Sequence, residues 1–329
     1  MLALAAGVLA AATACTGNAT PPPTRAAAAT TTPSPPPTTY AVTPAEAAKE
    51  FSKITVTDDK LRVKSSLQGR LGLAVDQTTG GQTQLTVAAF LSTDYAPPRY
   101  RWGPPTLFVP KFGPDERAPW FSALATRNGR PALLTFAKSD RWRISSVAEL
   151  LPGQEVPEIE LDADGYATAL AADDKSVTIS PQFMGPVHAS VAETGSAGVT
   201  AGLLGAGPYT TDVAEQIAGL RKQAKDDELS YDSIFSADNY PVHALRTKDG
   251  GALIQYSLTR NTTTRNMTNK SYIIPVPQEA GWAIDGPTVR LNLKLTETHQ
   301  YATVVPPLTD PQAAVVIAHD GALTRASGQ

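Results

Sequence analysis

A segment rich in both basic and aromatic side chains holds the residues best suited to binding chemistry. Between Arg99 and Arg143 the acids are only Asp115, Glu116 and Asp140. The basic residues of the segment are Arg99, Arg101, Lys111, Arg117, Arg127, Arg130, Lys138, Arg141 and Arg143. Aromatic residues interleave with them, including Tyr100, Trp102, Phe108, Trp120 and Trp142. Guanidinium groups bind carboxylates and phosphates, and aromatic faces bind cations, so the mixture predicts binding of an anionic glycan, a phosphate polymer or an acidic partner. The candidate ligand-binding residues here are Arg99, Arg101, Trp102, Arg127 and Trp142.

The alternative is that these bases pair with acids of the same chain. The following segment, from Ile144 to Asp174, contains eight acids and no Lys or Arg. Neighbouring strands drawn from the two segments would then have complementary charges. Exposed pairs of this kind need no ligand and contribute little to stability.

Residue patterns for catalysis and for transition metals are missing from the sequence. There is no Gly-x-Ser-x-Gly motif, and the histidines are scattered without metal-ligand spacing. We therefore predict a protein that is not an enzyme and that has no metal site and no cofactor. His243 is a further candidate ligand-binding residue, because strand alternation places it on the same face as Leu245 and Thr247. That role requires this face to line a cavity; a buried or solvent-facing histidine is the common alternative.

Four carboxylates alternate with apolar residues between Glu158 and Asp164. A strand here would carry all four on one face, which suits a hard cation such as calcium. The segment lacks the full calcium-loop pattern, so the alternative is a charged edge strand that avoids pairing with other chains.

The first residues are typical of a bacterial lipoprotein leader. The apolar run Leu2 to Ala14 is 13 residues long and is followed by Cys15, which is the one cysteine of the 329-residue chain. A run of this length suits a signal peptide, whereas a membrane span needs roughly 20 residues. The sequence predicts a leader over residues 1–15 with lipid attached to Cys15, and a disordered Pro/Thr-rich tether over residues 16–42. The expected location is extracytoplasmic, with the membrane as a partner through the anchor. The net charge of −3 argues against nucleic acid as a partner.

Two helix starts and a set of short repeated motifs indicate how the rest is organised. Thr43-Pro44-Ala45-Glu46 has the cap, first-turn proline and acid of a helix start, and residues 211–226 have the apolar spacing of an amphipathic helix. Each helix opens one half of the chain, which predicts a first domain over residues 43–180 and a second over residues 181–329.

Three motifs recur in the same order in both halves and suggest a tandem duplication. The first is a hairpin at Asn128-Gly129 or Asp249-Gly250, since these pairs favour tight turns. The second is Trp142-Arg143-Ile144 against Trp282-Ala283-Ile284, and the third is Tyr166-Ala167-Thr168 against Tyr301-Ala302-Thr303. The polar insert over residues 261–270 is predicted to be a loop.

These features together are similar to known folds and families. A helix followed by long twisted strands resembles the cone-shaped folds of the nuclear-transport-factor and cystatin-like superfamily. With the leader, the tether and the stretch from Leu245 to Leu253, the chain resembles actinobacterial lipoproteins that carry a domain of unknown function. The resemblance implies an α+β fold of two tandem domains, each with a helix packed on a curved, mostly antiparallel sheet. The expected function is a non-catalytic binding or scaffold module of the cell envelope, acting on an unknown envelope protein or an anionic polymer. The alternative is a small-ligand carrier or enzyme that uses the cavity of one cone domain.

Overall fold

The computed structural model describes residues 40–63, 69–268 and 273–329. Its helices are α1 (Pro44–Leu61), α2 (Gly69–Val75), α3 (Gly81–Leu91), α4 (Pro181–Thr194) and α5 (Thr211–Asp226), with short 3-10 turns at Gly195–Ala197 and Gln278–Ala280. Its strands are β1 (Thr106–Phe108), β2 (Trp120–Arg127), β3 (Arg130–Lys138), β4 (Trp142–Leu150), β5 (Leu229–Ser236), β6 (His243–Arg246), β7 (Ala252–Asn266), β8 (Ile274–Pro275), β9 (Thr288–Val289), β10 (Asn292–Val305) and β11 (Val315–Gly328). The predicted leader, Cys15 and most of the tether lie outside the described residues. The described part contains no helix that is both long and apolar enough to cross a bilayer.

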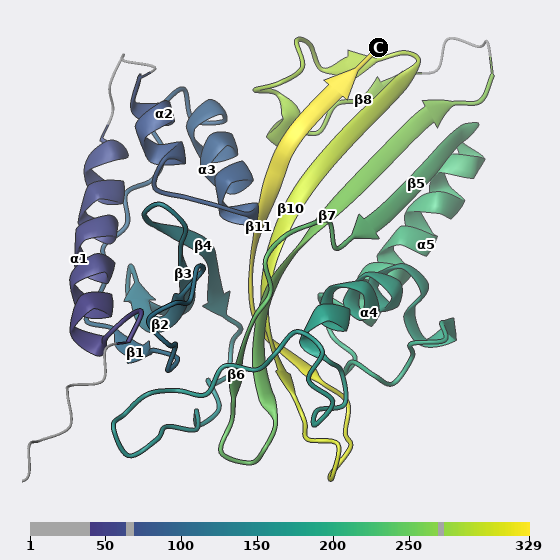
Figure 1. Cartoon of the computed structure of the whole chain (residues 1–329). Coiled ribbons are helices and arrows are strands. Elements are labelled where there is room, and N and C mark those ends of the chain that lie inside the picture. Colours follow the sequence, from purple (N-terminus) through teal and green to yellow (C-terminus); the bar gives the residue numbers. More distant parts are fainter. Residues whose placement is uncertain (1–39, 64–68, 269–272) are drawn as a thin grey trace, which may run out of the picture. The chain divides into compact units, whose positions relative to one another are not determined.

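One antiparallel sheet runs through the whole folded part (Figure 1). Its strand order is β1-β2-β3-β4-β11-β10-β7-β5, and β6 pairs with β7 beside this path. The strands of the first half join those of the second at a single short contact, where Leu150 and Glu149 of β4 pair with Ala318 and His319 of β11. Strands β8 and β9 form a separate two-stranded ribbon.

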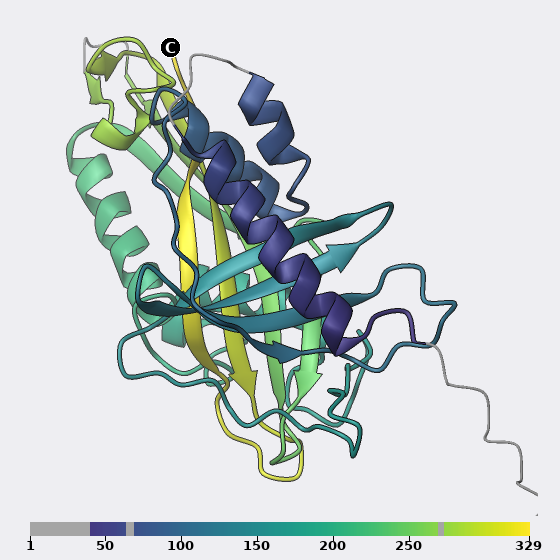
Figure 2. The same ribbon diagram turned by 90° about the vertical axis from the view of Figure 1, so that its left-hand side faces the viewer.

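The long strand β7 is buried on both faces, and this explains how the layers stack. Leu253 packs in a cluster with residues of β2, β3 and β4, whereas the next residue, Ile254, packs in the cluster beneath α4 and α5. Alternation along the strand therefore sends successive side chains to opposite layers. The face of β7 that carries Leu253 also carries the buried polar side chains of Gln255 and Ser257. Helices α4 and α5 lie on one side of the long strands, and α1 to α3 with β1 to β4 lie on the other (Figures 1 and 2).

Both predicted helix starts are confirmed. Helix α1 begins at Pro44, and the Thr43 hydroxyl accepts a hydrogen bond from the Glu46 amide at 3.2 Å. Helix α5 spans Thr211–Asp226 as its spacing predicts. The fold begins slightly earlier than expected, because Val42 is fully buried and the Tyr40 ring contacts that of Tyr166. The last residues of the predicted tether thus belong to the folded part.

The motif repeats are only partly reflected in the structure. The first motif forms a hairpin in both halves, β2–β3 and β6–β7. In the second pair, Trp142 opens β4, but Trp282 lies in a turn. In the third pair, Tyr301 lies inside β10, but Tyr166 lies in a segment with only isolated bridges. The loop predicted over residues 261–270 is wrong for residues 261–266, which continue β7, because their β-branched threonines fit a strand.

The α+β class is confirmed, with helices packed on a large antiparallel sheet. The structure does not show two separate domains, since Thr39–Gln329 form one compact unit and a shared apolar cluster joins the halves. The division at residue 180 and the likeness to cone folds stay predictions. In favour of a division, each half also has an apolar cluster made only of its own residues, one within residues 40–166 and one within residues 229–326.

Candidate binding site

The segment before β1 is held against the β2–β3 hairpin by hydrogen bonds. The Arg101 amide donates to Oδ1 of Asn128 at 2.8 Å, and the Asn128 amide donates to the Arg101 carbonyl at the same distance. Asn128 and Gly129 both have positive φ, as this tight turn requires. The turn type therefore fixes where Arg101 and Trp102 lie.

An open hollow of about 590 Å³ lies at this contact, and we call it the Arg101 hollow. Its lining residues are Arg101, Trp102, Gly103, Thr126, Asn128 and Gly129. Arg101 is exposed, and no carboxylate of the described residues forms an ion pair with it. Its neighbour Arg99 is different, because its Nε donates to Oδ1 of Asp59 at 2.8 Å. The hollow thus combines an aromatic ring with a guanidinium group that is available to a ligand.

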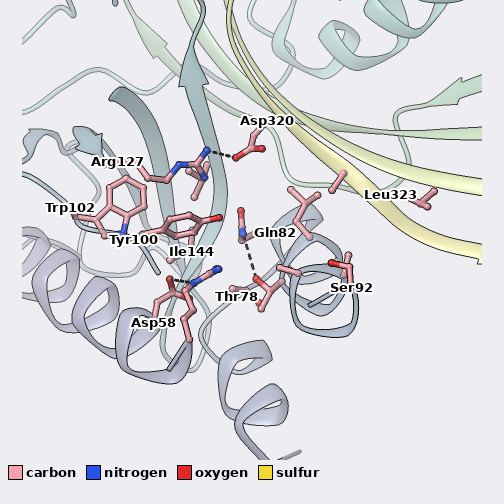
Figure 3. Close-up of a pocket in the computed structure, with 17 residues that line it drawn as sticks. Asp58, Thr78, Gln82, Ser92, Tyr100, Trp102, Arg127, Ile144, Asp320 and Leu323 are labelled. Carbon is pink, nitrogen blue, oxygen red and sulfur yellow. Dashed lines mark hydrogen bonds and ion pairs between the residues drawn. The ribbon is translucent and has the colours of Figure 1, made fainter. Parts of the chain in front are cut away.

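Trp102 also lines a smaller cavity of about 130 Å³, the junction cavity, between α1, α3, β4 and β11 (Figure 3). Tyr100 forms one wall, with its ring 6.2 Å from that of Trp102. Two guanidinium groups contact the Tyr100 ring: that of Arg62 lies 4.2 Å from the ring centroid and that of Arg127 lies 4.9 Å from it. Each is close enough for a cation–π interaction.

The charges of the junction cavity are largely balanced within the protein. Arg62 forms a buried ion pair with Asp58, with Nε and Oδ2 2.7 Å apart. Arg127 contacts Oε1 of Glu149 at 2.8 Å and Oδ2 of Asp320 at 2.7 Å. Burial acts to lower the pKa of Arg127, but the charges of Asp320 and Glu149 raise it overall. The guanidinium therefore stays ionised and holds both halves of the sheet together.

Gln82 is the polar side chain of this cavity that is not fully satisfied. Its amide nitrogen lies 3.4 Å from the Thr86 hydroxyl, but its buried Oε1 has no hydrogen-bond partner among the described residues. Figure 3 shows its amide beside Tyr100. A buried amide oxygen without a donor costs about 1–3 kcal/mol, so a donor group entering the cavity would bind here favourably.

The structure brings four of the six predicted ligand-binding residues together. Arg99, Arg101, Trp102 and Arg127 lie on or beside the contact between the hairpin and the preceding segment. Trp142 and His243 lie elsewhere.

Trp142 and His243 are both buried in the core. Trp142 packs on Phe121, and its Nε1 donates to Oε1 of Glu46 at 3.1 Å. The His243 ring packs on Trp120 at 4.9 Å, and burial lowers the pKa of His243 to about 4. Neither residue lines the Arg101 hollow or the junction cavity.

Several residues of the site were missed by the sequence reasoning. The pairing of Asp58 with Arg62 could have been predicted from the sequence, because an acid and a base four residues apart on a helix can pair. The role of Asp320 could not, because its approach to Arg127 depends on the contact between β4 and β11.

Much of the remaining charge is paired within the chain. Lys111 contacts Asp162 at 2.7 Å and Asp164 at 2.9 Å, so its ammonium group occupies the acidic segment where a cation was considered. Arg130 contacts Glu149 at 3.0 Å. Within the described residues no cluster of three or more His, Cys, Asp or Glu is arranged to hold a metal ion.

Comparison with known proteins identifies relatives but no function. The chain is 29% identical over 231 residues to an uncharacterized lipoprotein of Streptomyces coelicolor. The aligned residues cover 68% of this chain and 63% of that protein. It is 30% identical over 141 residues to an uncharacterized lipoprotein of Streptomyces avermitilis. Here the aligned residues cover 41% of this chain and 40% of that protein. The chain thus spans less than two thirds of the length of each of these relatives. No solved structure matches it. Residues 38–328 match a family described as a domain of unknown function, DUF8094, and the chain belongs to that family.

Proposed function

We propose that this chain is a lipid-anchored extracytoplasmic protein that acts as a non-catalytic binding module for an anionic polymer of the cell envelope. The Arg101 hollow is the proposed binding surface. The observation that carries the proposal is the exposed, unpaired Arg101 beside Trp102 in an open hollow. A guanidinium group next to an aromatic ring suits phosphate or acidic sugar groups.

The anchor is supported by the sequence and by the relatives. A short apolar run precedes Cys15, and both Streptomyces relatives are named lipoproteins. The tether would separate the folded part from the membrane. A binding surface held at that distance can reach polymers around the cell.

The non-catalytic role is supported by how the polar groups are placed. None of the four histidines lines the Arg101 hollow or the junction cavity. The charged groups of the junction cavity pair mainly with one another. Such groups position the binding surface rather than exchange protons with a substrate.

The binding proposal is tested by titrating the full chain with polyphosphate and with dextran sulfate, using neutral dextran as the control. We expect binding to the two anionic polymers that weakens as salt is added. Arg101→Ala and Trp102→Ala should each weaken binding about tenfold, equivalent to about 1.4 kcal/mol. The matched control is Arg290→Ala, which removes an exposed arginine outside the hollow. Equal losses from Arg101→Ala and Arg290→Ala would show that net charge, not this hollow, governs binding.

The anchor is tested separately by cell fractionation. The chain should be found with membranes, and Cys15→Ala should move it to the soluble extracytoplasmic fraction. Unchanged membrane retention of Cys15→Ala would contradict lipid attachment at this residue.

A small-ligand carrier is the second candidate function. It is favoured by a cavity of about 450 Å³ beside α5, which is within the size range of ligand sites.

A further inference from the structure

The cavity beside α5, which we call the α5 groove, lies in the second half of the chain and is distinct from the Arg101 hollow. It is bounded by α5, β5, β7, β8 and β10. Its volume of about 450 Å³ is roughly three times the 150 Å³ of a cavity that holds benzene. It can therefore contain an organic molecule rather than a few waters.

The walls of the α5 groove are mostly apolar. They are formed by Leu220 and Ala224 of α5, by Leu293 and Leu295 of β10, and by Ile274 of β8. Burying an apolar chain between these residues contributes about 0.8 kcal/mol for each methylene group. The ligand of this groove should accordingly have an apolar body.

The ionisable groups that line the groove are predominantly acidic. They are the carboxylates of Asp227, Glu279 and Glu297 and the guanidinium of Arg260. Arg260 is already engaged, because its Nε donates to Ser233 at 2.8 Å and its NH1 lies 3.5 Å from Oε2 of Glu297. Asp227 and Glu279 are exposed, and within the described residues neither forms an ion pair.

The end of α5 adds to this negative potential. Asp227 is the C-cap residue of α5, and the carbonyl groups at a helix C-terminus carry a partial negative charge. A cation at the mouth of the groove would be attracted both by these carbonyl groups and by the two carboxylates.

From this charge complementarity we infer that the α5 groove binds a small amphipathic amine, with its apolar body between α5 and β10 and its ammonium group near Asp227 and Glu279. The inference specifies the ligand class for the second candidate function. It depends neither on the lipid anchor nor on the Arg101 hollow.

The test compares three probes of equal chain length with the full chain by isothermal titration calorimetry. The probes are n-octylamine, n-octanol and n-octanoate, each kept below the concentration at which it aggregates. We expect n-octylamine to bind about tenfold more tightly than n-octanol, equivalent to about 1.4 kcal/mol, and n-octanoate to bind most weakly. Equal affinity for the amine and the alcohol, or tighter binding of the octanoate, would overturn the inference.

Variants locate the site. Asp227→Asn combined with Glu279→Gln should bring the affinity for n-octylamine down to that for n-octanol. Glu215→Gln is the matched control, because Glu215 is an exposed acid of α5 that does not line the groove. An equally large loss of affinity for n-octylamine in the Glu215→Gln variant would also overturn the inference.

A filling variant tests the apolar part of the site. Ala224→Leu places a larger side chain in the groove and should weaken binding of both n-octylamine and n-octanol, while circular dichroism confirms that the variant is folded. Unchanged binding in a folded Ala224→Leu protein would place the probes elsewhere. If no probe binds the full chain but n-octylamine binds after residues 16–39 are deleted, the tether itself occupies the groove and the inference is wrong.

Discussion

His299 and His319 face each other across β10 and β11, with Nδ1 of His299 3.0 Å from Nε2 of His319. The His319 ring also stacks on Tyr209 with a centroid separation of 3.9 Å. His188 lies in the same cluster and contacts the Tyr256 hydroxyl through Nδ1 at 2.6 Å. Three of the four histidines thus form one cluster, although His188 is far in sequence from the other two.

The histidine cluster should make the fold sensitive to acid. Burial lowers the pKa of His188 and of His299 to about 4, and burial with the neighbouring histidines lowers that of His319 to about 3. These groups are neutral when folded, but in the unfolded chain they take up protons below about pH 6.5. The stability that these neutral rings contribute is therefore fully present above about pH 6.5 and is lost as the pH falls towards 4.

Urea denaturation at pH 7.5 and pH 5 measures this effect. We expect the free energy of unfolding to be smaller at pH 5 by about 1–2 kcal/mol for each histidine that stays neutral in the fold. Burial raises the pKa of Glu297, which acts in the opposite direction and offsets part of the loss. His319→Phe keeps a ring against Tyr209 and should reduce the pH dependence. Equal stability at both pH values would contradict the assignment.

Arg127 should be far more important for stability than its neighbour Arg130. Both contact Glu149, but Arg127 is buried and also contacts Asp320, whereas the Arg130 side chain is 75% exposed. Arg127→Gln leaves Asp320 without its cation and Glu149 with only the exposed Arg130, and it should destabilise the fold by about 3–5 kcal/mol. Arg130→Gln should cost at most about 1 kcal/mol. Thermal unfolding of the two variants measures this difference. Similar losses of stability would mean that water already solvates the ion pairs of Arg127.

Local sequence patterns correctly predicted the features that depend on interactions between residues close together in the sequence. The Thr43 cap, the helix at residues 211–226 and the Asn128-Gly129 turn all depend on residues within one or two turns of each other. The turn also determines where Arg101 lies, so the position of the candidate site follows from a local signal. Pairing of acids with bases followed from the segregation of charge.

Features that depend on distant contacts could not be predicted in this way. Helix α4 contains Pro186, which normally argues against a helix. The segment packs closely on other elements, since a Cβ on Gly185 would lie 2.9 Å from that of Ala237. Helix α3 was missed because its buried residues are not confined to one face, as expected for a helix between layers. Asp320 reaches Arg127 only through the contact between β4 and β11.

Gln255 should couple the two halves of the chain. Its amide nitrogen donates to the Ser122 hydroxyl at 2.6 Å, and its amide oxygen accepts from the Thr135 hydroxyl at 2.8 Å. All three side chains are buried between the layers. Gln255→Leu leaves two hydroxyl groups without this partner and should cost about 1–3 kcal/mol for each.

The reference for Gln255→Leu is the triple variant that also carries Ser122→Ala and Thr135→Val. Removing all the polar partners together should restore much of the stability, because no buried polar group is then left without a hydrogen bond. Calorimetry should show one unfolding transition for the folded part of each variant. Two separate transitions would show that the halves unfold independently and that these hydrogen bonds do not couple them.

Gly81 should be required at the start of α3, where this helix meets the long strands. A Cβ at this position would lie 2.6 Å from Oγ of Ser257 on β7 and 3.3 Å from Nε2 of Gln300 on β10. Alanine normally stabilises a helix by about 1 kcal/mol over glycine, but here the steric overlap should dominate, and Gly81→Ala should destabilise the fold by about 1–3 kcal/mol. Gly72→Ala in α2 is the matched control, because nothing lies within 4 Å of its added Cβ. Chemical denaturation should show a lower free energy of unfolding for Gly81→Ala but not for Gly72→Ala. Combining Gly81→Ala with Ser257→Gly should restore the free energy of unfolding. A Gly81→Ala protein as stable as the Gly72→Ala protein would mean that α3 can move away from β7 without cost.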